Sequence, residues 1–151
     1  MVREMIISGL TMDPQTNTPI VVLKDPDSET SLPIWIGLLE ATAIATELEK
    51  VEFSRPMTHD LIKNLMGHLG AKVEKIEVCD LRDNTFYAWI YLNVNGKETR
   101  IDARPSDALA IALRAKARIY VDEQVIEKSG KLDSTAKVEI KDEEAKKWTD
   151  I

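Results

Sequence analysis

Cysteine is almost absent from this chain of 151 residues, and so are the signals of secretion and of membrane insertion. The one cysteine, Cys79, excludes an intramolecular disulfide and fits a reducing cytoplasm. No run of about 18 apolar residues is present, so the sequence predicts no membrane-spanning helix. The N-terminus enters a strand-like pattern directly, without the features of a signal peptide. We therefore expect a cytoplasmic protein that does not insert into a membrane.

The sequence also lacks the common motifs of nucleotide-dependent and zinc-dependent enzymes. It contains no Walker loop, dinucleotide fingerprint, nucleophile elbow or zinc-spaced set of cysteine and histidine. A net charge of −6 argues against a protein that binds polyanions with its whole surface. Basic side chains nevertheless concentrate in residues 97–120, which hold six of them against three acids. Such an island can bind a phosphate locally, and it can equally be ordinary surface.

Hydrophobic periodicity predicts an α+β domain. Strands are expected at 2–11, 18–24, 29–36, 71–81, 85–94, 97–103 and 118–121, and helices at 38–51, 57–69 and 105–116, with a helical turn at 122–128. Asn95-Gly96 is typical of a two-residue type I′ hairpin turn, and a second turn is expected at Asp83-Asn84. Beyond Gly130 the chain becomes charged and poor in apolar residues. We therefore place a domain at 2–128 and a peripheral tail at 129–151, with a short helix at 141–150.

The order of three strands followed by a helix occurs twice, with an offset of 67 residues. Ala41 aligns with Ala108, and Glu40 aligns with Asp107. A duplication of this kind predicts two β3-α units, and hence two sheets with two central helices between them. The fold class we expect is a three-layer β/α/β domain, with the 57–69 helix inserted between the halves.

A first charged cluster lies where the 97–103 strand gives way to a helix. Its members are Asp102, Arg104, Ser106 and Asp107. Pro105 suits the first helical position, which places Asp107 in the first turn, where a carboxylate is favourable. One interpretation is a functional cluster, and the other is a well-capped helix. Arg104 aligns with Gly37 in the other half, whereas Asp107 has a counterpart there, so Arg104 and Asp102 are the better candidates for function.

A second charged cluster again follows an Arg-Pro pair and precedes a helix. It consists of Arg55, Thr58, His59 and Asp60. Thr58 is a candidate N-cap, and Asp60 is favourable in a first turn on dipole grounds alone. His59 is a candidate base, and a solvated histidine is the alternative interpretation.

Together these residue types match the needs of phosphodiester cleavage, namely a group that activates water and positive charge that stabilises the transition state. Candidate catalytic residues are Asp102, Arg104, Asp107 and His59, and candidate substrate-binding residues are Arg55, Ser106 and Thr58. Candidate ligands for a divalent ion, Mg²⁺ or Mn²⁺, are Asp102, Asp107 and Glu40.

An aromatic stripe formed by Tyr87, Trp89 and Tyr91 alternates along the 85–94 strand. Such a stripe can stack nucleic-acid bases. A strand that is apolar on both faces is more typically covered by helices or by a partner subunit, and we favour that interpretation. It leads to the hypothesis of a homodimer.

Three segments resemble the bifunctional nuclease (BFN) domain family: LPIWIG at 32–37 with Glu40-Ala41, RP at 55–56 with THDL at 58–61, and IDARPSDA at 101–108. The resemblance covers about residues 2–128. It implies a compact α+β domain and, for some members, nuclease activity on both DNA and RNA. Many relatives carry a UvrB/UvrC-like helical segment after the domain, and residues 129–151 show no clear one. The resemblance does not identify the catalytic residues.

The leading hypothesis is therefore a nuclease that hydrolyses DNA, RNA or both, with assistance from a metal. The alternative is a non-catalytic regulatory module that binds an anion or a protein partner at the Arg-Pro segments.

Overall fold

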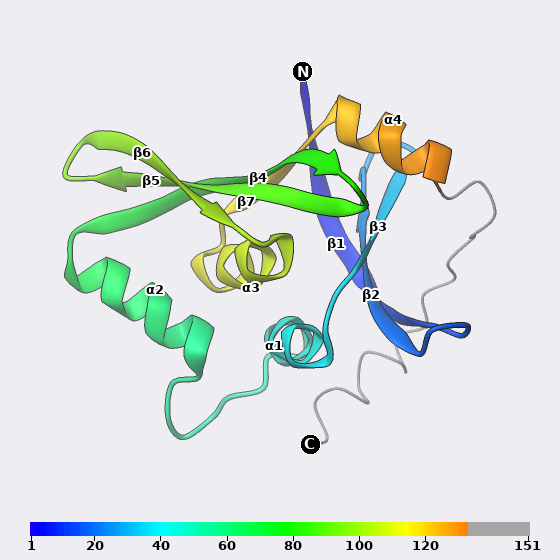
Figure 1. Cartoon of the computed structure of the whole chain (residues 1–151). Coiled ribbons are helices and arrows are strands. Elements are labelled where there is room, and N and C mark those ends of the chain that lie inside the picture. The colour runs from blue at the N-terminus through cyan, green and yellow to red at the C-terminus, as the bar shows by residue number, and fades with distance from the viewer. Residues whose placement is uncertain (133–151) are drawn as a thin grey trace.

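The computed structural model describes residues 1–132 and confirms a mixed α+β protein (Figure 1). The elements in chain order are β1 (Val2–Asp13), β2 (Thr18–Lys24), β3 (Ser31–Trp35), α1 (Leu38–Leu48), α2 (Thr58–His68), β4 (Ala71–Arg82), β5 (Thr85–Val94), β6 (Lys97–Ala103), α3 (Pro105–Ala115), β7 (Arg118–Asp122) and α4 (Glu123–Leu132). The helix predicted at 141–150 lies outside the described residues.

The strands of the described chain form one sheet of seven, in the order β3-β2-β1-β7-β4-β5-β6, where the repeat predicted two separate sheets. Strand β1 joins the two parts because its beginning pairs with β7 and its remainder pairs with β2. The register of β1 shifts between Ile7 and Gly9, and such an irregularity bends a strand. Figure 1 accordingly shows β4, β5 and β6 crossing the view while β1, β2 and β3 run down it.

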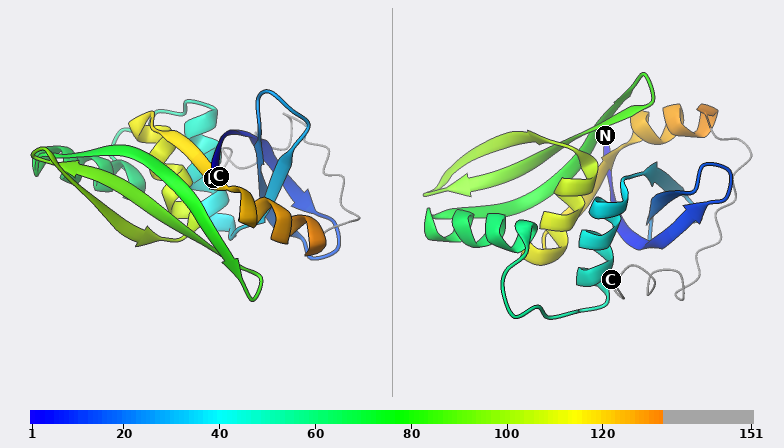
Figure 2. Two further views of the ribbon diagram at one scale, coloured as in Figure 1. Left: turned by 90° about the horizontal axis from the view of Figure 1, so that it is seen from above. Right: turned by 60° about the horizontal axis from the view of Figure 1, so that its bottom comes forward.

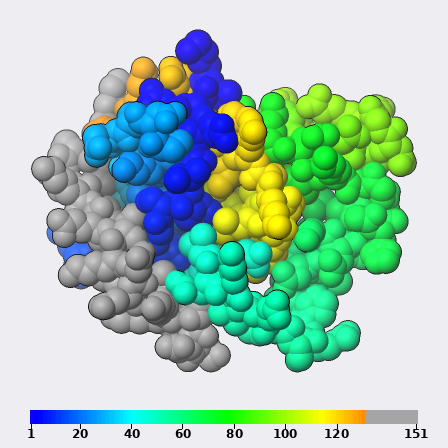
Figure 3. Space-filling model, turned by 180° about the vertical axis from the view of Figure 1, so that it is seen from behind, coloured from blue at the N-terminus to red at the C-terminus, as the bar shows by residue number. Residues whose placement is uncertain are grey.

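Helices α1 and α3 pack against each other in the angle between the two parts of this sheet (Figure 2). Their contact is close because fully buried alanines, among them Ala41, Ala45 and Ala108, keep side-chain volume small. Helix α2 packs on α3 and β4. Seen from behind, α3 lies between the N-terminal strands and the segment from α2 to β5 (Figure 3). The central helices therefore lie within one bent sheet, and the duplication itself stays a prediction.

Helix boundaries differ from the predicted ones at two places that matter for the site. Helix α1 ends at Leu48 instead of residue 51, and Lys50 follows with a positive φ of 53°. The N-cap of α2 is Met57, so Thr58 is the first helical residue and not the cap. The carboxylate of Asp60 accepts a hydrogen bond from the Met57 backbone N–H at 3.0 Å and closes this helix end.

The C-terminal part of the described chain is a longer helix than the predicted turn at 122–128. Helix α4 extends to Leu132, and its Val125 and Ser129 are both buried. Packed structure therefore continues past residue 128. Within residues 1–132, no helix is long and apolar enough to cross a membrane.

Both predicted hairpin turns are confirmed by positive φ angles at their two central residues: 50° and 62° at Asp83 and Asn84, and 53° and 88° at Asn95 and Gly96. Replacing Gly96 by alanine should lower the free energy of unfolding by about 1–2 kcal/mol, because a Cβ is disfavoured at positive φ. Chemical denaturation measures this loss.

Gly67→Ala is the matched control. Gly67 lies in α2 with open space around its Cα, so alanine there should stabilise by roughly 0.5 kcal/mol. Equal effects at both positions would contradict the backbone argument.

Candidate active site

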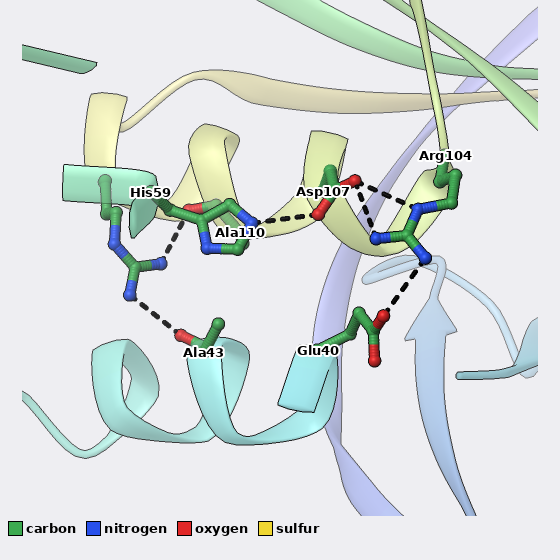
Figure 4. A network of polar contacts seen from close by, with 7 residues as sticks. Glu40, Ala43, His59, Arg104, Asp107 and Ala110 are labelled. Atoms are coloured by element: carbon green, nitrogen blue, oxygen red, sulfur yellow. Dashed lines mark hydrogen bonds and ion pairs between the residues drawn. The ribbon is translucent and has the colours of Figure 1, made fainter. Parts of the chain in front are cut away.

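The two predicted charged clusters meet at the beginnings of three helices (Figure 4). The Nε2 atom of His59, in the first turn of α2, lies 2.9 Å from Oδ1 of Asp107 in the first turn of α3. The guanidinium of Arg104 contacts Oδ2 of Asp107 and Oε1 of Glu40, in the first turn of α1, each at 3.1 Å. We call Glu40, His59, Arg104 and Asp107 the helix-end network.

Local sequence explains how α3 contributes two members of this network. Arg104 is the N-cap residue with an extended backbone (φ −68°, ψ 145°), and Pro105 occupies the first helical position. Asp107 therefore falls three residues after Arg104, where the two side chains reach each other on one side of the helix end. An acid here also suits the positive end of the helix dipole.

The protonation of His59 follows from its partner. Burial acts to raise the pKa of Asp107, but hydrogen bonds from His59 and Arg104 outweigh it and hold the pKa below its ordinary value. The carboxylate is thus ionised near neutral pH and can only accept hydrogen bonds. In the neutral ring, Nε2 of His59 must then carry the hydrogen, which leaves Nδ1 with the free lone pair.

Exposure differs strongly across the network. The His59 side chain is 12% exposed, whereas the Arg104 side chain is 66% exposed. The imidazole is therefore shielded from solvent, while the guanidinium is accessible.

A cleft of about 320 Å³ opens beside the network. It lies between the β3–α1 junction, the β4–β5 turn and the β6–α3 junction, and Glu40, Arg104 and Ser106 line it. Ser106 is predominantly buried, so its place in the wall is set by packing. Among the predicted substrate-binding residues, Ser106 is the one that shares this cleft with Arg104.

A second set of contacts, centred on Arg114, holds the three helices together. Its Nε donates to Oδ1 of Asp60 at 2.8 Å, and its terminal nitrogens donate to the carbonyls of Ala110 and Ala43 at 2.9 and 3.0 Å. The side chain is only 4% exposed. We call these three contacts the Arg114 clamp. Because Asp60 is next to His59 in the sequence, the clamp also positions the imidazole of His59.

Sequence reasoning missed Arg114. A single arginine within the otherwise apolar segment 108–115 was the available signal, because a buried guanidinium needs several partners.

The remaining substrate-binding candidates lie away from Arg104. Arg55 lines a second cleft of about 360 Å³, which Asp60 and Arg114 also border and which Arg104 and Asp107 do not line. Thr58 is an exposed residue at the start of α2. The structure thus brings His59 to Asp107 and Arg104, and it keeps Arg55 in a separate cleft.

Asp102 is placed on the opposite face of the sheet from the network. It pairs with Trp89, whose neighbours Ala88 and Ile90 point into the core, so Asp102 and Trp89 share the outer face. Arg100 lies over the Trp89 ring on that face, 4.2 Å from its centroid. Arg104 lies beyond the end of β6 at Ala103, where the chain turns into α3, and this turn separates Arg104 from Asp102.

The sequence predicted that helices or a partner subunit would cover the aromatic stripe. Within residues 1–132, no helix covers it on this outer face (Figure 2). Its rings carry cations instead: Lys75 lies over Tyr91, and Arg82 lies over Tyr87. The homodimer, which supplied the other expected cover, stays a prediction.

The three predicted metal ligands do not meet in one coordination site. Asp102 is on the outer face, both oxygens of Asp107 are engaged by His59 and Arg104, and Arg104 also holds Glu40. Among the described residues, no group of three or more histidine, cysteine, aspartate or glutamate side chains could hold a metal ion. This donor set does not fit a divalent ion in the arrangement observed.

Acid should destabilise the helix contacts. Burial acts to raise the pKa of Asp60, but the Met57 N–H and Arg114 lower it below the ordinary 3.8. A carboxylate with a lowered folded pKa stabilises the fold above its unfolded pKa, and this stabilisation is lost as the pH falls through the folded pKa. The free energy of unfolding should therefore fall below about pH 4, and Asp60→Asn should flatten that fall.

Denaturant titrations at several pH values measure this dependence. Asp27→Asn, at an exposed turn, controls for the loss of one carboxylate. An unchanged pH dependence in Asp60→Asn would contradict the assignment.

An α+β domain that sets a histidine–carboxylate pair beside an exposed guanidinium is suited to proton transfer on an anionic substrate. The chain belongs to the bifunctional nuclease domain family, whose model matches residues 21–134. It is 38% identical over 153 residues to the uncharacterized protein Rv1829 of Mycobacterium tuberculosis, covering 98% of this chain and 92% of that one.

Plant relatives carry the family's name. Bifunctional nuclease 1 of Arabidopsis thaliana is 28% identical over 130 residues, covering 78% of this chain and 40% of that protein. Bifunctional nuclease 2 of Oryza sativa subsp. japonica is 30% identical over 107 residues, covering 68% and 33%. The match therefore spans about a third to two fifths of these plant proteins. The family resemblance drawn from the sequence is confirmed.

Proposed function

We propose that the chain hydrolyses phosphodiester bonds of DNA and RNA at the helix-end network. Membership of a nuclease family supports this class of reaction. The observation that carries the proposal is the His59–Asp107 hydrogen bond, which lies beside the open guanidinium of Arg104.

Each member of the network has a role in this proposal. Nδ1 of His59 accepts the proton of the attacking water as the oxygen bonds to phosphorus, and returns a proton to the oxygen of the leaving nucleotide. Asp107 positions the ring and balances the imidazolium charge, as a carboxylate does behind other catalytic histidines.

Arg104 contacts a non-bridging oxygen, where negative charge increases in the transition state. Its three contacts with Asp107 and Glu40 use three of the five N–H donors of a guanidinium. These carboxylates orient the Arg104 guanidinium and leave its remaining N–H donors free to bind the phosphate.

Cleavage of end-labelled single-stranded DNA and RNA tests the site. The wild type should cleave both, and Arg104→Gln should lower the rate by about 10²- to 10³-fold, because it removes the positive charge at the phosphate. Asp102→Asn should leave the rate unchanged, because Asp102 lies on the outer face. A large loss in Asp102→Asn with an active Arg104→Gln would contradict the proposed site and support the carboxylate site expected from sequence.

Dependence on Mg²⁺ or Mn²⁺ is a separate proposal that rests on the sequence motifs. Chelation followed by addition of either ion, in the same cleavage reaction, decides it.

A second candidate function is a non-catalytic module that binds an anion or a protein partner. The observation that favours it is that Arg104 is already balanced by two carboxylates, which resembles a structural lock as much as a catalytic site. Binding of oligonucleotides or of inorganic phosphate without cleavage, with and without divalent ions, would support this candidate over the nuclease.

A further inference from the structure

The cleft beside the helix-end network has an aromatic lining that the proposed chemistry does not use. Trp35 reaches it from the end of β3, and Phe86 reaches it from the start of β5. The two rings thus come from different parts of the bent sheet, and each is only partly buried. Partly exposed rings in a concave wall offer a surface for a flat, apolar group.

Trp35 is held ready for such a contact. Its side chain keeps a large accessible surface, with the residue 40% exposed, and its Nε1–H donates to Oδ2 of Asp13 at 2.9 Å. The indole is therefore fixed in orientation while its surface stays accessible. A ring already ordered in the free protein loses little conformational entropy when a ligand stacks on it.

The same cleft contains the groups that suit a phosphate and a polar edge. Arg104 and Ser106 stand at the beginning of α3, and Asn84 and Thr85 stand at the β4–β5 turn. An aromatic platform, a guanidinium and amide and hydroxyl groups together match the three parts of a nucleotide: base, phosphate and the hydrogen-bonding edge of the base.

We infer that this cleft binds one unpaired nucleobase against Trp35, with the adjoining phosphate at Arg104. The inference rests on the proposed function, since both place a phosphate of the strand at Arg104, which lines this cleft. A volume of about 320 Å³ is near the lower end of the roughly 300–1,000 Å³ typical of small-ligand pockets, so one nucleotide unit fits and a base pair does not.

The size of the cleft limits which nucleic acids can bind there. A base in a duplex must leave its stack and its partner before it enters the cleft, which costs a few kcal/mol. Single-stranded DNA and RNA are therefore the substrates of this site, and duplexes are disfavoured.

Binding of thymidine 3′,5′-bisphosphate, measured by calorimetry, tests the inference without any cleavage step, because this nucleotide has no diester bond. Trp35→Ala should weaken its binding by about 5- to 100-fold, the range expected for loss of one stacked base. Binding of 2-deoxyribose 5-phosphate, which lacks the base, should change less than about twofold. Trp35→Phe keeps a ring and should retain most of the affinity.

Trp89→Ala on the outer face is the matched control, since Trp89 is a half-buried tryptophan that lies away from this cleft. Unchanged nucleotide binding in Trp35→Ala, loss in Trp89→Ala alone, or no nucleotide binding to the wild type would each overturn the inference. Trp35-dependent binding in a chain that cleaves neither DNA nor RNA would support the inference and refute the proposed nuclease instead.

Discussion

Replacing His59 by glutamine should lower the rate of phosphodiester cleavage by about 10²- to 10⁴-fold, the usual contribution of general acid–base catalysis. Glutamine can still donate a hydrogen bond to Asp107, so the contact between α2 and α3 is kept. What it cannot do is take a proton at the position of Nδ1. The loss should therefore appear in the rate of the chemical step, measured under single-turnover conditions, and not in the stability of the fold.

His68 provides the control within the same helix. It is the other histidine of the chain, exposed at the last residue of α2 and outside the helix-end network. His68→Gln should keep the wild-type rate, whereas Asp107→Asn should lower it, because an asparagine can donate to the ring and favour the wrong tautomer. Full activity in His59→Gln would remove the imidazole from the mechanism.

Arg114→Met should lower the free energy of unfolding by about 2–4 kcal/mol. Breaking a buried ion pair typically costs roughly 3–5 kcal/mol, and the lower range applies because the Asp60 side chain remains 33% exposed to water. Methionine keeps much of the packing volume but leaves the carbonyls of Ala43 and Ala110 without this donor. Urea denaturation measures the change.

Arg118→Met gives the comparison at the surface. Arg118 is 72% exposed and lies 3.8 Å from Glu4, so its loss should cost less than about 1 kcal/mol. Similar losses in the two variants would show that Arg114 contributes no more than a surface arginine. Because the Arg114 clamp fixes the start of α2, Arg114→Met should also reduce cleavage even where the protein remains folded.

The turns and helices that could be predicted from sequence are those determined by residues close together in the chain. The type I′ turn at Asn95-Gly96 depends on two adjacent residues that tolerate positive φ, and helix α3 depends on a periodicity within eleven residues. Both signals lie within short segments. The single sheet could not be predicted in this way, because it depends on β7 inserting between β1 and β4.

The candidate site was predictable in its residue types and less so in its geometry. His59, Arg104 and Asp107 were identified from two Arg-Pro segments, but their meeting required α2 and α3 to pack at their beginnings. Asp102 was grouped with them by closeness in sequence, but it lies on the outer face of β6 beside Trp89, whereas Arg104 lies past the end of that strand. Arg114 carried no motif, since its importance comes from burial that only the tertiary structure reveals.

The position of β7 also has a consequence for how the chain is made. Strand β1 pairs with β7 through Val2 and Asp122, which are 120 residues apart, and β7 in turn lies parallel to β4. On the ribosome, the first three strands and the β4–β5–β6 hairpins emerge before the strand that joins them. Until residues 118–122 are released, the paired edge of β1 stays open, and such an edge recruits other strands. Completion of the sheet therefore waits until residues 118–122 have emerged, and long-range pairing of this kind is slow.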